Sequence, residues 1–192
     1  MNERSRNNGR RIRSEHAKLI KTVMCAFFTA LTVVCSQIAI PTPWGVPINL
    51  ALFSVYLSGA LLGAFWGTLS MVLYVLLALA GVPVLAGLRG GASAVFGVTG
   101  GYIVGYILAA FAVGLIARLW GRSIAKLITA CSAGCFLCYL FGTVWFSIYS
   151  DTGFFVALSL CVLPYLIGDA LKIAVCAVIS SRLYKHLPAE LK

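Results

Sequence analysis

The length of the apolar segments is the feature that most constrains the fold of this chain. No Asp, Glu, Lys or Arg occurs between residues 22 and 88, and further long apolar runs follow. A soluble domain has about 25% charged residues because its surface faces water, whereas 10% of this chain is charged. The runs are continuous, as membrane-spanning helices require, and lack the alternation of a β-barrel. The sequence therefore predicts an all-α integral membrane protein.

Prolines, glycines and charged residues divide the apolar sequence into six predicted transmembrane helices. We expect them over residues 20–40, 48–64, 66–81, 98–119, 125–149 and 163–184. The first run is too long for the apolar part of a signal peptide, so it is expected to be an uncleaved helix. The predicted organisation is a basic N-terminal tail over residues 1–17, one transmembrane domain over 18–185 and a short C-terminal tail over 186–192.

The basic residues predict the orientation of these helices. They form three clusters: one precedes the first helix, one lies between the fourth and fifth helices, and one follows the sixth. Since an even number of helices lies between the clusters, all three and both termini are expected on the cytoplasmic side of the cell membrane. The net charge of +10 then reflects topology and attraction to membrane lipids, and predicts no nucleic-acid binding. Arg89, in an outer connection, and Lys172, inside the last helix, do not follow this pattern.

A candidate binding site is built from these two exceptions and Asp169. Asp169 and Lys172 are three residues apart, so they share one helix face, and Arg89 can approach them from the outer connection. A charge at this depth costs roughly 2.5–3.5 kcal/mol on insertion scales, so even a self-neutralising Asp–Lys pair, the structural alternative, suggests a function. The three groups together carry a net charge of +1, which a monoanion would balance, and a guanidinium matches a carboxylate.

The segment around Arg89 is too rich in glycine for an ordinary helix. It reads GLRGGASAVFGVTGG over residues 87–101. Gly90 and Gly91 are expected to let the backbone come close to a ligand. Aromatic residues near the outer ends are expected either to line an apolar slot or to lie in the membrane interface; they are Trp44, Tyr74, Phe96, Tyr102, Trp145 and Tyr149. Glycines at four-residue spacing, such as Gly59 and Gly63, predict close helix packing.

Three cysteines, Cys131, Cys135 and Cys138, share one face of the fifth predicted helix. They could form a metal or redox cluster or act as small packing residues, which is the ordinary role of buried cysteine. The sequence has no GxxxxGK[ST], HExxH or GxSxG motif and no paired carboxylates. We therefore expect no enzyme activity, no cofactor and no metal site.

Three stretches resemble, in order, the BioY family, the biotin-binding S components of energy-coupling factor (ECF) vitamin transporters. They read ALFSVYLSGALLGAFWGTLSMVLYVLLALAG, GVPVLAGLRGGASAVFGVTGGYIVGY and LPYLIGDALKIAV. The resemblance covers roughly residues 18–185, and its specific part is the Arg-Gly-Gly loop combined with Asp-x-x-Lys in the last helix. It implies a six-helix S-component bundle that captures biotin from outside. Such a component works with a transmembrane coupling protein and two cytoplasmic ATPases, and topples in the membrane to release the vitamin.

The resemblance also implies roles for individual residues. Arg89 and Lys172, or one of them, would bind the biotin carboxylate, and Asp169 would bind the ureido end or orient Lys172. Many family members have Thr-Leu-Gln where this chain has Asn49-Leu-Ala, so Asn49 is expected to replace the missing glutamine contact. Tyr74 completes the expected substrate-binding set with Gly90 and Gly91.

The first helix commonly carries an Ala-x-x-x-Ala surface that docks on the coupling protein, and Ala26 and Ala30 supply it here. Three alternatives remain open. The ligand could be another small monocarboxylate, such as lipoate or dethiobiotin. The chain could act as a solitary biotin carrier. It could instead be a membrane redox or assembly protein that uses its cysteines.

Overall fold

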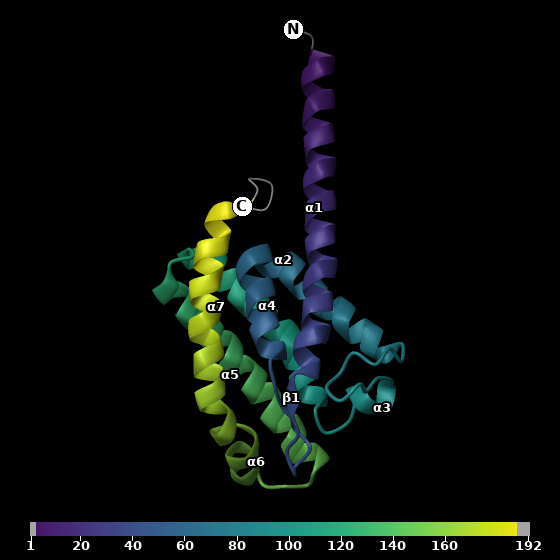
Figure 1. Cartoon of the computed structure of the whole chain (residues 1–192), viewed down its shortest axis with the longest axis vertical. Coiled ribbons are helices and arrows are strands. Elements are labelled where there is room, and N and C mark those ends of the chain that lie inside the picture. Colours follow the sequence, from purple (N-terminus) through teal and green to yellow (C-terminus); the bar gives the residue numbers. More distant parts are fainter. Residues whose placement is uncertain (1–2, 188–192) are drawn as a thin grey trace.

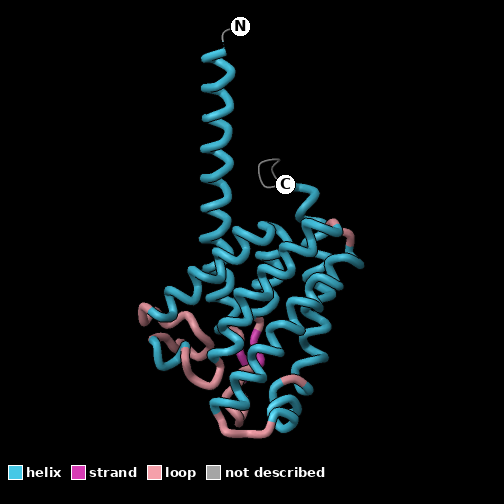
Figure 2. Tube along the Cα trace, turned by 180° about the vertical axis from the view of Figure 1, so that it is seen from behind, coloured by secondary structure: helices cyan, strands magenta, loops and turns pink. Residues whose placement is uncertain are grey.

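The structure, a computed structural model, describes residues 3–187 as a bundle of helices. α1 begins and α7 ends toward the same end of the bundle, and the short strands and most loops lie at the other (Figures 1 and 2). The elements are α1 (Glu3–Gln37), β1 (Ala39–Ile40), β2 (Ile48–Asn49), α2 (Ala51–Leu79), α3 (Ala92–Val95), α4 (Gly100–Trp120), α5 (Ile124–Tyr149), α6 (Phe154–Cys161), the 3-10 turn η1 (Leu163–Tyr165) and α7 (Leu166–His186).

Within the described residues, five helical stretches are long and apolar enough to cross a membrane. They are Glu15–Gln37, Ala51–Leu79, Gly100–Trp120, Ile124–Tyr149 and Phe154–His186. Large apolar side chains cover the outside of the bundle; Ile167, Phe155 and Ile148, for example, are 87%, 83% and 78% exposed. An apolar outer surface of this extent is unfavourable in contact with water, but it is favourable in contact with lipid. The first part of α1 continues beyond the bundle (Figure 1).

α2 contains the second and third predicted helices as two arms joined by a bend. Gly63 is non-helical, with φ of 82° and ψ of 179°, a conformation that residues with a Cβ rarely adopt. A Cβ on Gly67 would lie 2.9 Å from the Cα of Gly59, so the second arm folds back closely on the first. A Cβ on Gly114 of α4 would lie 2.3 Å from the nitrogen of Ala64. The glycines therefore allow both the bend and its close contact with α4.

Arg122, between α4 and α5, supports this bend from the side. Its Nε donates a hydrogen bond to the carbonyl oxygen of Ala60 at 2.8 Å, one of the carbonyls near the end of the first arm that the helix itself leaves unpaired. Its guanidinium carbon lies 4.0 Å from the centre of the Tyr184 ring. Partial burial lowers the pKa of Arg122, and Tyr184 opposes this shift, but an arginine stays protonated at neutral pH.

The bundle centre is formed mainly where α2 meets α4 and where α4 meets α5. Gly101 and Gly105 of α4 lie against α5, since a Cβ on them would come within 2.3 Å of Trp145 and 3.0 Å of Cys138. All seven cysteines are buried and free, and the Sγ of Cys138 lies 3.8 Å from the carbonyl oxygen of Tyr102. No group of His, Cys, Asp and Glu in the described part of the chain is arranged to hold a metal ion. The cysteine face is thus part of the helix packing.

Candidate binding site

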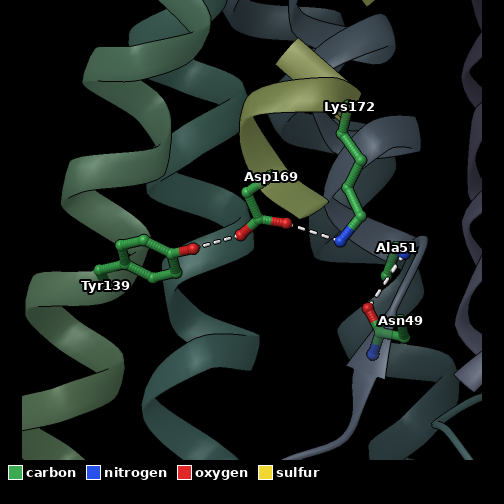
Figure 3. Close-up of polar contacts among 5 residues, drawn as sticks. All are labelled: Asn49, Ala51, Tyr139, Asp169 and Lys172. Atoms are coloured by element: carbon green, nitrogen blue, oxygen red, sulfur yellow. Dashed lines mark hydrogen bonds and ion pairs between the residues drawn. The ribbon is translucent and has the colours of Figure 1, made fainter. Parts of the chain in front are cut away.

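A buried charged group forms at the start of α7. The turn η1, which contains Pro164, leads into α7 and places Asp169 and Lys172 in its first two turns. Lys172 Nζ lies 2.6 Å from Asp169 Oδ1, and the two side chains are 10% and 4% exposed. Tyr139 of α5 donates its hydroxyl to the other oxygen of Asp169 (Figure 3). Both carboxylate oxygens therefore have a partner, as burial of a charge requires.

A cavity of about 60 Å³ lies beside this group. Five of the predicted substrate-binding residues lie around it although they come from four separate parts of the sequence: Asn49, Tyr74, Arg89, Asp169 and Lys172. The remaining wall is mostly apolar and aromatic, and is formed by Val46, Pro47, Leu52, Leu85, Ala86, Thr99, Tyr102, Ile103, Tyr106, Cys161 and Tyr165. Mostly apolar walls with a few converging polar groups are typical of sites for small molecules.

Arg89 occupies the rim of the cavity. Its loop is closed by a backbone pair in which the nitrogens of Leu85 and Arg89 donate to each other's carbonyl oxygens at 2.9 and 3.3 Å. Its Nε donates to the carbonyl oxygen of Ala86 at 3.1 Å, and the side chain is exposed. Neither of the ion pairs found in the described residues involves Arg89. The guanidinium of Arg89 thus lies at the entrance of the cavity and has no carboxylate partner among the described residues.

The end of α1 and the middle of the second arm of α2 hold this loop in place. The carbonyl oxygen of Val84 accepts hydrogen bonds from Ser36 at 2.6 Å, from Gln37 at 3.1 Å and from the Tyr74 hydroxyl at 3.1 Å. Gln37 also donates to Leu85 at 3.0 Å and accepts from the backbone nitrogen of Leu88 at 3.1 Å. Tyr74 therefore does two things: it lines the cavity and anchors the Arg89 loop.

Gly90 and Gly91 lie outside the cavity wall, against the end of α2. A Cβ on Gly90 would lie 2.3 Å from the carbonyl oxygen of Val82. Gly91 has φ of 90° and donates its nitrogen to the carbonyl oxygen of Ala78 at 2.7 Å. The backbone of these two glycines therefore lies close to the end of α2 and to the turn that follows it, and their expected contact with a ligand stays a prediction.

Two further connections close the outer end of the site. Asn49, on β2, accepts a hydrogen bond from the nitrogen of Ala51 at 3.1 Å and so starts α2 (Figure 3). The hydroxyl of Tyr165 accepts from Trp44 Nε1 at 3.1 Å and donates to the carbonyl oxygen of Val46. The segment between β1 and β2 is thereby joined to η1. Of the other aromatics singled out, Tyr102 lines the cavity, whereas Trp145 donates to the carbonyl oxygen of Gly97 at 3.0 Å.

The model of the BioY family matches residues 7–189. The chain belongs to the BioY family. Two relatives are named biotin transporter BioY: that of Thermotoga maritima is 39% identical over 85% of this chain and 95% of its own length, and that of Rhodobacter capsulatus is 32% identical over 88% and 95%. The crystal structure of the S-component for biotin from an ECF-type ABC transporter superposes with a TM-score of 0.83 at 30% identity, covering 91% of this chain and 95% of that one.

The predicted fold class is therefore confirmed: this member of the BioY family is a multi-pass membrane protein with the architecture of an ECF S component. Sequence reasoning missed three residues around the BioY-family site, Tyr139, Gln37 and Tyr165. Each is a polar side chain within or at the end of an apolar helix or turn, which is the signal that could have found it. The predicted docking residues Ala26 and Ala30 lie on an exposed face of α1, and their role stays a prediction.

Proposed function

We propose that this chain is a biotin-binding S component that captures biotin from outside the cell and delivers it across the cytoplasmic membrane. The observation that carries the proposal is the buried Tyr139–Asp169–Lys172 group beside a cavity with Arg89 at its rim. Membership of the BioY family and the likeness to a biotin S-component support the choice of ligand. The chain has no nucleotide-binding motif, so a separate ECF coupling protein and its two ATPases would supply the energy.

The charges of the site suit biotin, which carries one carboxylate at neutral pH. Arg89 and Lys172 contribute two positive charges and Asp169 one negative charge, so the empty site has a net charge of +1 and the occupied site would be neutral. A lysine ammonium has three protons, and one of them is used on Asp169. The other two remain available for the carboxylate, together with the planar guanidinium of Arg89.

Because Lys172 Nζ lies 2.6 Å from Asp169 Oδ1, these two groups cannot hold opposite ends of one extended ligand. Asp169 would bind the ureido end where Arg89 alone holds the carboxylate, and would otherwise orient Lys172. A carboxylate offers about four lone-pair directions, and two of them are used by Tyr139 and Lys172. The remaining ones can accept the N–H groups of the ureido ring. Tyr102, Tyr106 and Leu52 line the same cavity and would contact the apolar part of the vitamin.

Calorimetric titration of biotin into the purified protein tests the proposal. We expect tight binding by the wild type and at least tenfold weaker binding by Arg89→Ala, whose exposed side chain can be removed without disturbing the core. Lys172→Ala should abolish binding, but it also leaves Asp169 partly unpaired, so the double variant Asp169→Asn/Lys172→Gln is its control for folding. Absence of biotin binding by folded wild-type protein, or full affinity in Arg89→Ala and Lys172→Ala, would overturn the proposal. Competition by dethiobiotin and lipoate measures specificity.

A further inference from the structure

A second, larger cavity lies at the opposite end of the bundle, next to the bend of α2. Its volume is about 720 Å³, and it shares no residue with the biotin cavity. It lies between the bend at Gly63, the second half of α4 and α1, which contributes Lys21. Each arm of α2 is shorter than a helix that crosses the bilayer, so the longer α1 leaves space beside the bend.

Three basic side chains converge on this cavity. Lys21 comes from α1, Arg118 from the last turn of α4 and Arg122 from the connection to α5. No carboxylate lines it, and the ion pairs found in the described part of the chain, Lys18–Glu15 and Lys172–Asp169, involve none of the three. Arg122 is held in place by Ala60 and Tyr184. The cavity thus has a net positive charge that nothing in the described residues balances.

The rest of the wall is apolar apart from Thr68, whose hydroxyl has no hydrogen-bond partner in the described residues. Seven apolar residues from the two arms of α2 and from α4 form it: Leu62, Phe65, Trp66, Leu69, Val72, Phe111 and Leu115. Phe65 and Phe111 are 70% and 48% exposed, so this wall opens toward the lipid. A tryptophan beside cations is typical of the depth at which headgroups meet acyl chains. A soluble anion would leave this apolar wall uncovered, whereas an amphiphile with an anionic head covers both parts.

We propose that this cavity binds an anionic phospholipid of the cytoplasmic leaflet, with the phosphate between Lys21, Arg118 and Arg122 and an acyl chain along the apolar wall. Basic pockets between transmembrane helices on the cytoplasmic side have the chemistry that such headgroups require. The lipid would contact α1, the bend of α2 and α4 together. It would therefore fix the position of the bend relative to α1.

Native mass spectrometry of the full-length protein in a neutral detergent tests this inference, with phosphatidylglycerol and phosphatidylcholine titrated separately. We expect retention of one phosphatidylglycerol in preference to phosphatidylcholine. The double variant Lys21→Gln/Arg118→Gln should bind phosphatidylglycerol at least about tenfold more weakly, because each basic residue near a membrane surface contributes to this attraction. The matched control is Lys126→Gln/Arg182→Gln, which removes the same charge from exposed positions outside the cavity and should bind like the wild type.

A third variant, Leu115→Trp, fills part of the apolar wall and keeps every charge. It should also weaken phosphatidylglycerol binding, whereas an ion held by the cations alone would be unaffected. Gel filtration and the melting temperature check that each variant is folded. Three results would overturn the inference. They are an equal loss of lipid in both double variants, equal retention of the two lipids, and a cavity that is covered by the coupling protein while the protein shows no preference between the lipids.

Discussion

Removing the hydroxyl of Tyr139 tests whether the carboxylate of Asp169 is held ready for a ligand. In Tyr139→Phe the ring remains, but one oxygen of Asp169 loses its donor. Asp169 is 3% exposed, so water cannot readily replace that donor. A hydrogen bond to a charged group contributes about 1.5–3 kcal/mol, which corresponds to roughly a tenfold to hundredfold change in an equilibrium constant. We expect a lower melting temperature and a biotin affinity that is weaker by up to roughly a hundredfold.

The assay is calorimetric titration of biotin, with the melting temperature in the same detergent measured alongside. Tyr149→Phe is the matched control, because Tyr149 lies on the same helix but is 54% exposed, and it should behave like the wild type in both measurements. If Tyr139→Phe kept wild-type affinity within a factor of two and the wild-type melting temperature, the argument that Tyr139 positions Asp169 would be refuted.

Three further predictions concern the backbone that positions the site. Gly90→Ala places a Cβ 2.3 Å from the carbonyl oxygen of Val82; the displaced Arg89 loop should cost about 1–3 kcal/mol and weaken biotin binding in the titration. Gln37→Leu removes the hydrogen bonds to the same loop and should accelerate biotin release, measured by exchange of labelled biotin. Gly114→Ala forces α4 away from the bend of α2 and should lower the melting temperature, with biotin affinity less affected than in Gly90→Ala. The control for both glycine variants is Gly153→Ala, where a Cβ meets nothing within 4 Å, and a similar loss of stability in that variant would contradict the steric argument.

The charged part of the site could be predicted because charges are rare in this sequence. Asp169 and Lys172 stand out in an apolar helix and Arg89 in an outer connection, so composition alone isolates the groups that the structure brings to one cavity. The helices could be placed because few charged residues interrupt the apolar runs, and because the thickness of the membrane sets the length that each run needs.

The remaining features depend on contacts between distant segments. The predicted break between the second and third helices lies next to the bend, but the spacing does not show that Gly63 takes a positive φ, because a glycine that packs against a helix gives the same pattern. Tyr139 stands out in the sequence as a polar side chain in an apolar helix, but its contact with Asp169 depends on how α5 is rotated about its axis, which the sequence of α5 does not show. Gln37 meets its acceptors 47 and 48 residues further along the chain, a separation that no local pattern encodes.

The ion pair between Lys172 and Asp169 has a consequence for the return of the unloaded protein in the proposed transport cycle. These buried charges cancel each other while no ligand is present, and the unbalanced cation, Arg89, lies at the surface. The vacated site therefore carries one uncompensated charge, that of Arg89, when it changes its orientation in the lipid, whereas the charges of Lys172 and Asp169 stay balanced. Resetting the carrier would then need electrostatic work for Arg89 alone, and the loaded site, in which the biotin carboxylate balances Arg89, would need none.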